Sequence, residues 1–440
     1  MERNGTERTT AGEHTGGCPA VDLFSADFTA DPWPAFARLQ HTSPVHHDPT
    51  TGLWLVSRHR DVRRILLDPE RFRPDNTLDA VARMSIPALR HLAAAGFALP
   101  PTLANNGTDR HPGLRSLVSG LLSGARVTAA APLVERLTHR HLDAVEAELA
   151  AHGHCDLVTT LTRDLPFTVM LDILGLRADV DADTGVDLTT LARWNDASLE
   201  LFWGLPPRAR QPGLARLAAD FFTWLGGLAD RAAPGGPGLL GLLAAHRHPD
   251  GTPLGRQEIV AVCYFMIIAG QATTGQMLAT MLQRALHDTA LWPRLGTEPG
   301  LAQAWAEEML RREPPLTAWR RVTAAPVRIG GTALPAGAPL LLMLAATGSD
   351  PRVFDAPHAL RPGRPRARDH LSFGIGRHRC PGAALARMEA RVVLRTVSHR
   401  CPTLRPARPA AEEPLLGLLS FRAPMQVMVR PGGDRGGDGG

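Results

Sequence analysis

The stretch that decides the fold is His370-Leu-Ser-Phe-Gly-Ile-Gly-Arg-His-Arg-Cys380-Pro-Gly-Ala-Ala-Leu-Ala386. Gly374 and Gly376 allow a tight loop that passes close to a bulky group. Strong helix formers follow from Ala383, so Cys380 is predicted at the positive end of a helix. More positive charge surrounds it, from Arg377, His378, Arg379 and Arg387. These surroundings predict a lowered thiol pKa and a cysteine that attacks substrate or binds metal. The alternative is a buried structural cysteine.

The glycine spacing in this stretch favours the metal ligand. The pattern Phe373-Gly-x-Gly-x-His-x-Cys-x-Gly-x-x-Leu-Ala386 resembles the haem-binding signature of the cytochrome P450 superfamily without a gap. The resemblance implies that the cofactor is haem b (iron protoporphyrin IX) and that Cys380 is the axial ligand of its iron. The other signature residues implied at the cofactor are Phe373, Gly374, His378 and Gly382.

Composition excludes several other classes of protein. The 440 residues carry a formal net charge of +5, and every basic residue other than histidine is arginine, which indicates a GC-rich coding bias as in actinomycetes. Arginine is not interleaved with aromatic residues, so nucleic-acid binding is not expected. No run of eighteen apolar residues and no apolar N-terminal signal occurs, which predicts a cytoplasmic protein without a membrane span. The five cysteines are scattered, without zinc or disulfide spacing.

The chain is predicted to be mainly α with small β-sheets. Polar, glycine-rich tails are expected to be disordered at residues 1–17 and 431–440, with one haem-thiolate monooxygenase domain over 18–430. Helices are expected near residues 31–39 and 61–67 and through most of 114–312, and short strands near 54–57 and within 327–344. From residue 31 to 429 this order resembles the cytochrome P450 fold.

A second motif lies at Glu307-Glu-Met-Leu-Arg311. Glu308 and Arg311 are three residues apart and could pair on one helix face; a solvated surface pair of this kind contributes little. The segment resembles the ExxR helix of the family, in which the pair meets a later arginine, here Arg364. The aromatic and acidic residues that precede this arginine in the family are replaced by Leu360 and Arg361. The resemblance implies a structural triad that braces the cysteine loop.

Several basic residues resemble the family's contacts with the haem propionates. His111 and Arg115 lie four apart, a spacing that is uninformative alone, and match an HxxxR motif. Arg321 matches the arginine that follows the ExxR helix, although Arg320 is adjacent. With His378, these cationic groups provide the charge-assisted hydrogen bonds that two carboxylates require.

The apolar segment at residues 258–278 predicts a long buried helix interrupted by Gly270 and Thr273. It could be an ordinary core helix whose threonine bonds back to a carbonyl. It also resembles the oxygen-activating stretch of the family, Ala-Gly-x-acid-Thr-Thr, which makes Gly270, Ala272 and Thr273 the candidate catalytic positions. Thr273 matches the alcohol of the proton relay. Ala272 replaces the acid, a departure that bears on proton delivery.

The substrate pocket is implied by resemblance alone, and each of its residues could equally belong to the core. The candidates are Phe97, Trp194, Phe265, Ala269, Leu316, Trp319 and Leu418.

The function that these motifs imply is a haem-thiolate monooxygenase that hydroxylates or epoxidises an apolar-bodied small molecule, in specialised-metabolite (antibiotic) biosynthesis. Electrons would come from a ferredoxin and an NAD(P)H-dependent ferredoxin reductase, and Arg377, Arg379 and Arg387 could form a basic docking face. One alternative is an atypical haem enzyme that performs oxidative coupling or nitration, or that acts on a substrate tethered to a carrier protein. The non-enzymatic alternative is a glycosyltransferase auxiliary protein, which retention of Cys380 disfavours.

Overall fold

The structure is a computed structural model that describes residues 21–180 and 185–432. The predicted N-terminal tail at 1–17 lies outside the described residues, as does most of the predicted C-terminal tail. Two residues assigned to that tail, Pro431 and Gly432, are described, and Gly432 lies against the Thr403 carbonyl.

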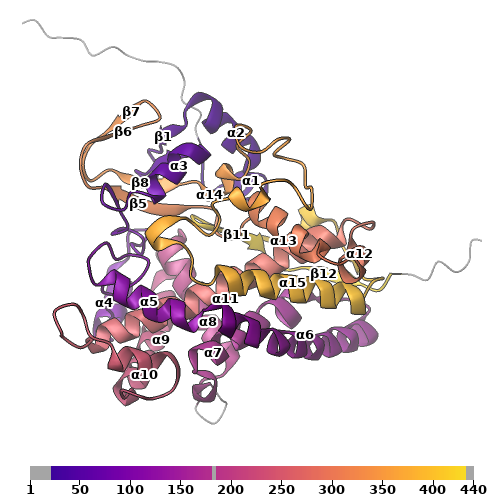
Figure 1. The fold of residues 1–440 in the computed structure, drawn as a ribbon, viewed down its shortest axis with the longest axis horizontal. Helices are drawn as coiled ribbons and strands as arrows, with labels where there is room; N and C mark the ends of the chain where they lie inside the picture. Colours follow the sequence, from indigo (N-terminus) through magenta and orange to yellow (C-terminus); the bar gives the residue numbers. More distant parts are fainter. Residues whose placement is uncertain (1–20, 181–184, 433–440) are drawn as a thin grey trace, which may run out of the picture.

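Helices make up most of the described chain (Figure 1). They are α1 (Ala26–Ala30), α2 (Trp33–Thr42), α3 (His59–Leu66), α4 (Ile86–Ala94), α5 (His111–Leu121), α6 (Gly124–His152), α7 (Asp164–Leu174), α8 (Leu188–Trp203), α9 (Gln211–Arg231), α10 (Gly238–Ala245), α11 (Arg256–Leu286), α12 (Trp292–Thr297), α13 (Leu301–Arg312), α14 (Leu344–Thr347) and α15 (Ala383–Arg400). The prediction of a mainly helical chain is confirmed.

Short strands form small sheets. The strands are β1 (Val45–His47), β2 (Trp54–Val56), β3 (Phe72–Arg73), β4 (Cys155–Asp156), β5 (Trp319–Thr323), β6 (Val327–Ile329), β7 (Thr332–Leu334), β8 (Pro339–Leu342), β9 (Arg405–Pro406), β10 (Leu415–Leu418), β11 (Phe421–Pro424) and β12 (Met428–Arg430). The largest sheet has the order β1-β2-β8-β5-β3, with β2 and β8 parallel and the other neighbours antiparallel. Strand β4 pairs with β12, so the predicted helical region contains one short strand that is completed from the far end of the chain.

Helix α11 forms the centre of the core. Its residues are apolar on nearly every side and most of them are buried, as the pattern over 258–278 predicts. The helix begins where the Glu258 carboxylate accepts the Gly255 N–H at 2.9 Å. Although α11 is long and apolar enough to cross a membrane, it is mostly buried inside the protein.

This arrangement positions the site between two layers. In Figure 1 the strands β1, β5 and β8 lie with α2 and α3 above α11, and α13 and α15 lie beside one another at its right. Residues 370–382, which precede α15, approach α11 across a cavity lined by both segments. The site therefore combines a loop near the C-terminal end of the chain with the central helix.

Candidate active site

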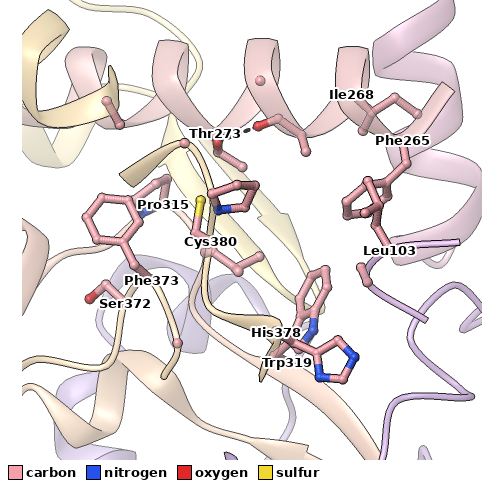
Figure 2. A pocket seen from close by; sticks show the side chains of 18 of the residues that line it. Leu103, Phe265, Ile268, Thr273, Pro315, Trp319, Ser372, Phe373, His378 and Cys380 are labelled. Atoms are coloured by element: carbon pink, nitrogen blue, oxygen red, sulfur yellow. Dashed lines mark hydrogen bonds between the residues drawn. The ribbon is translucent and has the colours of Figure 1, made fainter. Parts of the chain in front are cut away.

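The loop that carries Cys380 is shaped by glycine and by one backbone hydrogen bond. Gly376 has φ +78°, and a Cβ there would lie 2.9 Å from the Leu66 carbonyl oxygen of α3, so a side chain does not fit. The Cys380 N–H donates to the Phe373 carbonyl at 2.8 Å. Figure 2 shows the sulfur directed toward α11, which carries Thr273.

The electrostatic surroundings of Cys380 differ from the prediction. Burial raises the pKa of the Cys380 thiol, although a backbone hydrogen bond from Gly382 and the charges of nearby arginines lower it in part. The predicted lowered thiol pKa is therefore wrong. The cause is that the sulfur lies in a largely apolar cavity, where desolvation favours the neutral thiol. Because a metal ligand must give up its proton, metal binding would have to drive this ionisation.

Helix α5 presents His111 and Arg115 to the same cavity, on one face as their spacing predicts. Within the described part of the chain, Arg115 has no Asp or Glu partner. Burial lowers the pKa of Arg115, the nearby Cys380 sulfur raises it in part, and the neighbouring Arg379 lowers it. A half-buried guanidinium without an anion is a favourable place for a carboxylate ligand.

Of the two adjacent arginines in β5, Arg321 lines the cavity and Arg320 does not. The Arg320 guanidinium donates to the Asp79 carbonyl at 2.6 Å, in the segment before α4. Arg321 is 3% exposed, and its guanidinium donates to the Arg320 carbonyl at 2.7 Å. Burial lowers the pKa of Arg321 to about 10, which leaves it charged at neutral pH and without an acidic neighbour among the described residues.

The two histidines at this edge are neutral at neutral pH. Their rings lie 4.6 Å apart, and burial together with neighbouring positive charge lowers the pKa of His111 to about 3 and that of His378 to about 4. His378 Nε2 carries the hydrogen, because it bonds the Asn106 carbonyl at 2.9 Å. His111 Nδ1 accepts a bond from Arg377 at 3.2 Å, which leaves Nε2–H as the donor.

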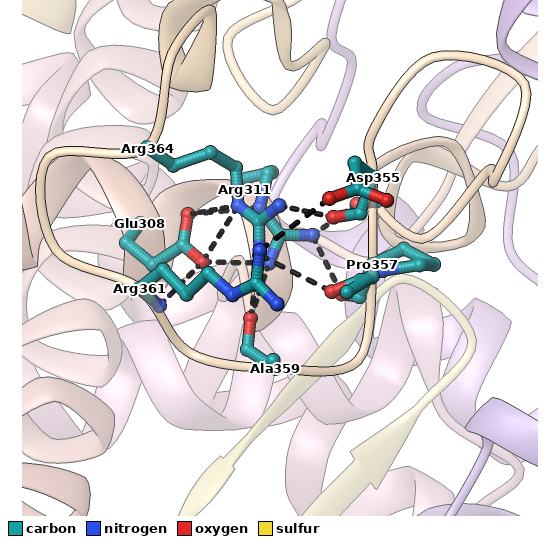
Figure 3. A network of polar contacts seen from close by, with 9 residues as sticks. Glu308, Arg311, Asp355, Pro357, Ala359, Arg361 and Arg364 are labelled. Carbon is teal, nitrogen blue, oxygen red and sulfur yellow. Dashed lines mark hydrogen bonds and ion pairs between the residues drawn. The ribbon is translucent and has the colours of Figure 1, made fainter.

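The predicted triad comes together on α13 (Figure 3). Glu308 and Arg311 share two hydrogen bonds of 2.9 Å, and both side chains are fully buried. Arg364 Nε adds bonds of 3.0 and 3.2 Å to the same carboxylate. The two guanidinium groups also bind carbonyl oxygens of residues 348–359, which lead toward the cysteine loop. The departure at Arg361 is accommodated because its backbone N–H donates to Glu308 at 2.9 Å.

Sequence reasoning missed a second acidic anchor, Glu307. Its carboxylate accepts bonds of 2.5 and 3.2 Å from Arg387 and a 3.4 Å bond from His370. The Arg387 guanidinium lies over the Phe373 ring at 4.6 Å, and Phe373 is the residue whose carbonyl holds Cys380. Burial raises the pKa of Glu307, but the bonds from His370 and Arg387 outweigh burial and lower it to about 2. The sequence did hold a signal for this anchor, because Glu307 directly precedes Glu308 of the predicted triad.

These contacts reduce the predicted docking face. Arg387 is held by Glu307, and Arg377 bonds His111 and the Thr108 carbonyl. Only Arg379 of the three is exposed and without a partner among the described residues. The expectation that all three arginines could form a docking face is therefore reduced to Arg379, because the other two bind groups of the same protein.

On α11, two of the three candidate catalytic positions reach the cavity. Gly270 and Thr273 line it, whereas Ala272 is buried outside the lining. Ala272 is therefore not in direct contact with the cavity, because consecutive helical residues differ by about 100° in direction. The Thr273 hydroxyl donates to the Ala269 carbonyl at 2.7 Å. Gln271 also lies outside the lining, and its side chain accepts a bond from Asn195 of α8.

Four of the seven predicted pocket residues line the cavity: Phe265, Ala269, Leu316 and Trp319. The other three expectations, Phe97, Trp194 and Leu418, are corrected, because these side chains lie outside the lining. Phe97 packs 5.0 Å from the Phe222 ring, and Trp194 stacks 5.8 Å from Phe221, both on α9. The tertiary packing of α8 and of the segment after α4 decides that these two aromatic residues face α9. Lining residues that were not predicted include Met170, Pro315 and Phe421.

The lining of the cavity fits a haem. The empty space inside it is about 1470 Å³, a volume that includes open solvent at the mouth. The cysteine sulfur lies on one wall, and the basic edge formed by His111, Arg115, Arg321 and His378 has no carboxylate partner among the described residues. Such a set calls for a ligand that brings its own carboxylates.

Comparisons with known proteins agree with this geometry. The family model described as cytochrome P450 matches residues 300–410. The chain is 32% identical to cytochrome P450 monooxygenase PikC of Streptomyces venezuelae, over 90% of this chain and 91% of that protein. It is 29% identical to 6-deoxyerythronolide B hydroxylase of Saccharopolyspora erythraea, over 87% and 92%. The solved structure of cytochrome P450 CREJ with (4-ethylphenyl) dihydrogen phosphate superposes with a TM-score of 0.84 at 26% identity, over 94% of this chain and 99% of that one.

The cysteine loop, the buried triad, the central helix and the similarity along nearly the whole chain agree, and the chain belongs to the cytochrome P450 family of monooxygenases.

Proposed function

We propose that the cavity holds haem b, with Cys380 as the axial ligand of its iron. The observation that carries this proposal is the pairing of a sulfur that faces the cavity with a basic edge that lacks an anion. When bound, a haem with a cysteine thiolate ligand supplies O₂ activation and the transfer of one oxygen atom to a substrate. The residues of the basic edge bind the propionates, and Phe373, Gly374 and Gly382 shape the wall on the cysteine side.

Thr273 is the residue that moves a proton in this proposal. Its hydroxyl donates to the Ala269 carbonyl at 2.7 Å within the helix. Exchange of that bond for one to a water or to the substrate turns the hydroxyl toward the cavity, where it passes a proton from Oγ1. Ala272 carries no proton, so the second member of the usual acid–alcohol pair is supplied by water or by the substrate itself.

The substrate is an apolar-bodied metabolite that is hydroxylated or epoxidised. The wall opposite the basic edge supports this, since it is built mostly from aliphatic and aromatic side chains. The names of two relatives, a P450 monooxygenase and a hydroxylase of 6-deoxyerythronolide B, support a role in antibiotic biosynthesis. Electrons come from a ferredoxin and its NAD(P)H-dependent reductase, in the cytoplasm, with Arg379 as the exposed cation near the cysteine loop.

A second candidate function is oxidative coupling or nitration by the same haem site, on a free or carrier-tethered substrate. The observation that favours it is Ala272, which removes an acid from the usual proton relay. The two candidates are distinguished by product analysis. Incorporation of one atom of labelled O₂ into the product supports oxygen insertion, whereas a product without the label supports coupling.

The test of the haem assignment is the reduced carbon-monoxide difference spectrum. Wild-type protein is expected to show a thiolate-type Soret band, and Cys380→Ser is expected to lose it while staying folded, because a hydroxyl is a poor replacement for the thiolate donor. Cys401→Ser, at a half-buried cysteine outside the cavity, is the matched control and should keep the band. A Cys380→Ser protein with an unchanged band would overturn the assignment of Cys380. A wild-type protein without the band would overturn both haem functions and leave the glycosyltransferase auxiliary protein as the remaining hypothesis.

A further inference from the structure

Three exposed apolar side chains lie on the outer side of α4 and on the turn between α8 and α9. Ile86 and Leu89 of α4 are 67% and 50% exposed, and Leu205 of the turn is 48% exposed. Ala88 and Leu92 on the other side of α4 are buried, so the helix packs with one face and leaves apolar residues of the opposite face uncovered. Of the seven large apolar side chains that are exposed in the described chain, three therefore belong to one short helix and one turn.

One buried side chain joins these two segments. Gln211, at the start of α9, accepts the N–H of Ser85 at 2.7 Å and donates to the Pro206 carbonyl at 3.2 Å. Ser85 directly precedes Ile86, and Pro206 directly follows Leu205. Helix α4 also packs beside α9 (Figure 1). The three exposed apolar residues, here called the apolar patch, are therefore held on neighbouring segments of one surface.

The charge around the apolar patch has one sign. Residues 83–94 and 204–217 contain no aspartate and no glutamate. They contain five arginines, all of them exposed: Arg83, Arg90, Arg208, Arg210 and Arg216. Arg210 pairs with Glu200 of α8 at 2.7 Å, whereas the other four have no acidic partner among the described residues. The apolar patch is thus flanked by cations whose charge the protein itself does not balance.

The same segments continue into the wall of the site. Phe202, three residues before Leu205, and Leu99, five residues after the end of α4, line a small hollow. This hollow shares Phe265 and Ile268 with the main cavity. The apolar patch is therefore connected through short stretches of chain to the apolar side of the cavity.

We propose that the apolar patch and its arginines bind the surface of an anionic lipid bilayer. Aliphatic side chains gain free energy when they enter the boundary between headgroups and acyl chains, and arginines gain it when they meet anionic headgroups. A second copy of the chain fits less well, because a two-fold contact would bring the unpaired arginines against one another. The contact is peripheral and places the cavity near the phase in which an apolar substrate dissolves. That consequence rests on the proposed function, whereas the binding itself goes beyond it.

Sedimentation with sucrose-loaded vesicles tests the proposal on the haem-loaded full chain. The probes are vesicles of phosphatidylcholine alone and vesicles with equal parts of phosphatidylcholine and phosphatidylglycerol. Wild-type protein is expected to bind the anionic vesicles at least about 10-fold more tightly than the neutral ones. The difference should shrink as the salt concentration rises, because salt screens the arginines.

A first double variant tests the apolar contribution. Ile86→Ser with Leu89→Ser should weaken binding to the anionic vesicles about 10-fold or more, because the apolar area available for insertion is lost. The matched control is Leu242→Ser with Met425→Ser, whose side chains are 42% and 53% exposed on other elements. The control should bind like wild type. Both variants change exposed side chains, and unchanged melting temperatures confirm that they are folded.

A second double variant tests the charges. Arg90→Gln with Arg208→Gln should weaken binding to the anionic vesicles about 10-fold or more and leave binding to the neutral vesicles unchanged. Arg63→Gln with Arg64→Gln, at two exposed arginines of α3, removes the same charge elsewhere. This control should change vesicle binding little.

Wild-type protein that does not sediment with the anionic vesicles overturns the bilayer as partner and leaves an acidic protein as the occupant of the apolar patch. Equal losses of binding in the patch variants and in their controls overturn the role of the patch, because net charge alone would then explain the attraction. Absence of the thiolate-type spectrum in wild type overturns the proposed function instead. The two failures are therefore read from separate measurements.

Discussion

The two walls of the cavity are held in different ways. On the cysteine side, Glu307 and Glu308 of α13 bind arginines that fix the segments before and after Cys380 through buried, charge-assisted hydrogen bonds. On the α11 side, the lining consists mostly of aliphatic and aromatic side chains, and Thr273 bonds only within its own helix.

The difference corresponds to what each wall must do under the proposed function, in which Cys380 binds the haem iron and the α11 side receives the substrate. A metal ligand has to stay within a fraction of an ångström of its place, and directional hydrogen bonds on rigid elements provide that. A wall that receives an apolar substrate needs a complementary shape rather than directional hydrogen bonds, and flexible side chains can adjust to the substrate. Substitutions on the cysteine side should therefore cost more stability than substitutions of similar size on the α11 side.

The largest effect is expected for Glu308→Ala. It leaves Arg311 and Arg364 buried without their anion, which costs about 3–5 kcal/mol. Loss of soluble, haem-loaded protein is the expected result, measured by expression yield and denaturant unfolding. The matched control is Glu298→Ala, which removes an exposed ion pair with Arg294 and should leave the unfolding free energy nearly unchanged, because solvent screens such pairs. Equal stability of the two variants would show that the triad does not brace the fold.

A pair of glycine substitutions compares the two walls directly. Gly376→Ala places a Cβ at φ +78° and 2.9 Å from a backbone oxygen of α3, and should cost about 2 kcal/mol or more. Gly270→Ala meets the Cγ, Sδ and Cε atoms of the Met170 side chain, which must shift as a whole. The gain in helix propensity of about 1 kcal/mol offsets much of this repacking. Its stability should stay within about 1 kcal/mol of wild type. The reverse order of the two unfolding free energies would contradict the comparison.

Glu307→Gln should cost about 1–2 kcal/mol at neutral pH, because the ion pair with Arg387 becomes a neutral hydrogen bond. Its acid sensitivity is also informative. The folded pKa of about 2 lies below the ordinary value of 4.5, so this stabilisation is present above pH 4.5 and is lost as the pH falls toward 2. Unfolding free energies measured between these limits should converge for wild type and Glu307→Gln. A gap that is constant with pH would show that the carboxylate charge is not involved.

The smallest effect on stability is expected for Thr273→Ala, under about 1 kcal/mol, since a hydroxyl that bonds back to its own helix stabilises little. Its effect should instead be on coupling, measured as product formed per NAD(P)H consumed. Positioned proton transfer contributes about 10²–10⁴-fold in rate, so more of the reducing power should be released as hydrogen peroxide. Unchanged coupling would mean that proton delivery does not pass through Thr273.

The sequence by itself determined the features that are local along the chain. The cysteine loop could be recognised because Gly374, Gly376 and Cys380 lie within a few residues, and the positive φ angles of the two glycines are a local backbone requirement. The central helix was equally clear, because an apolar pattern on all sides of a long helix has few explanations other than burial. The basic residues at the cavity edge were located through separate motifs, although the segments that carry them lie far apart in sequence.

Only the tertiary structure decided the contacts that depend on helix rotation and on distant segments. It packed Phe97 and Trp194 against α9 and outside the cavity lining, a choice that composition cannot make among aromatic residues. It also joined Glu307 to Arg387 across some eighty positions, and thereby removed that arginine from the free surface. Finally, it set the pKa of Cys380, because desolvation is a property of the assembled cavity and outweighs the charges that can be read from neighbouring residues.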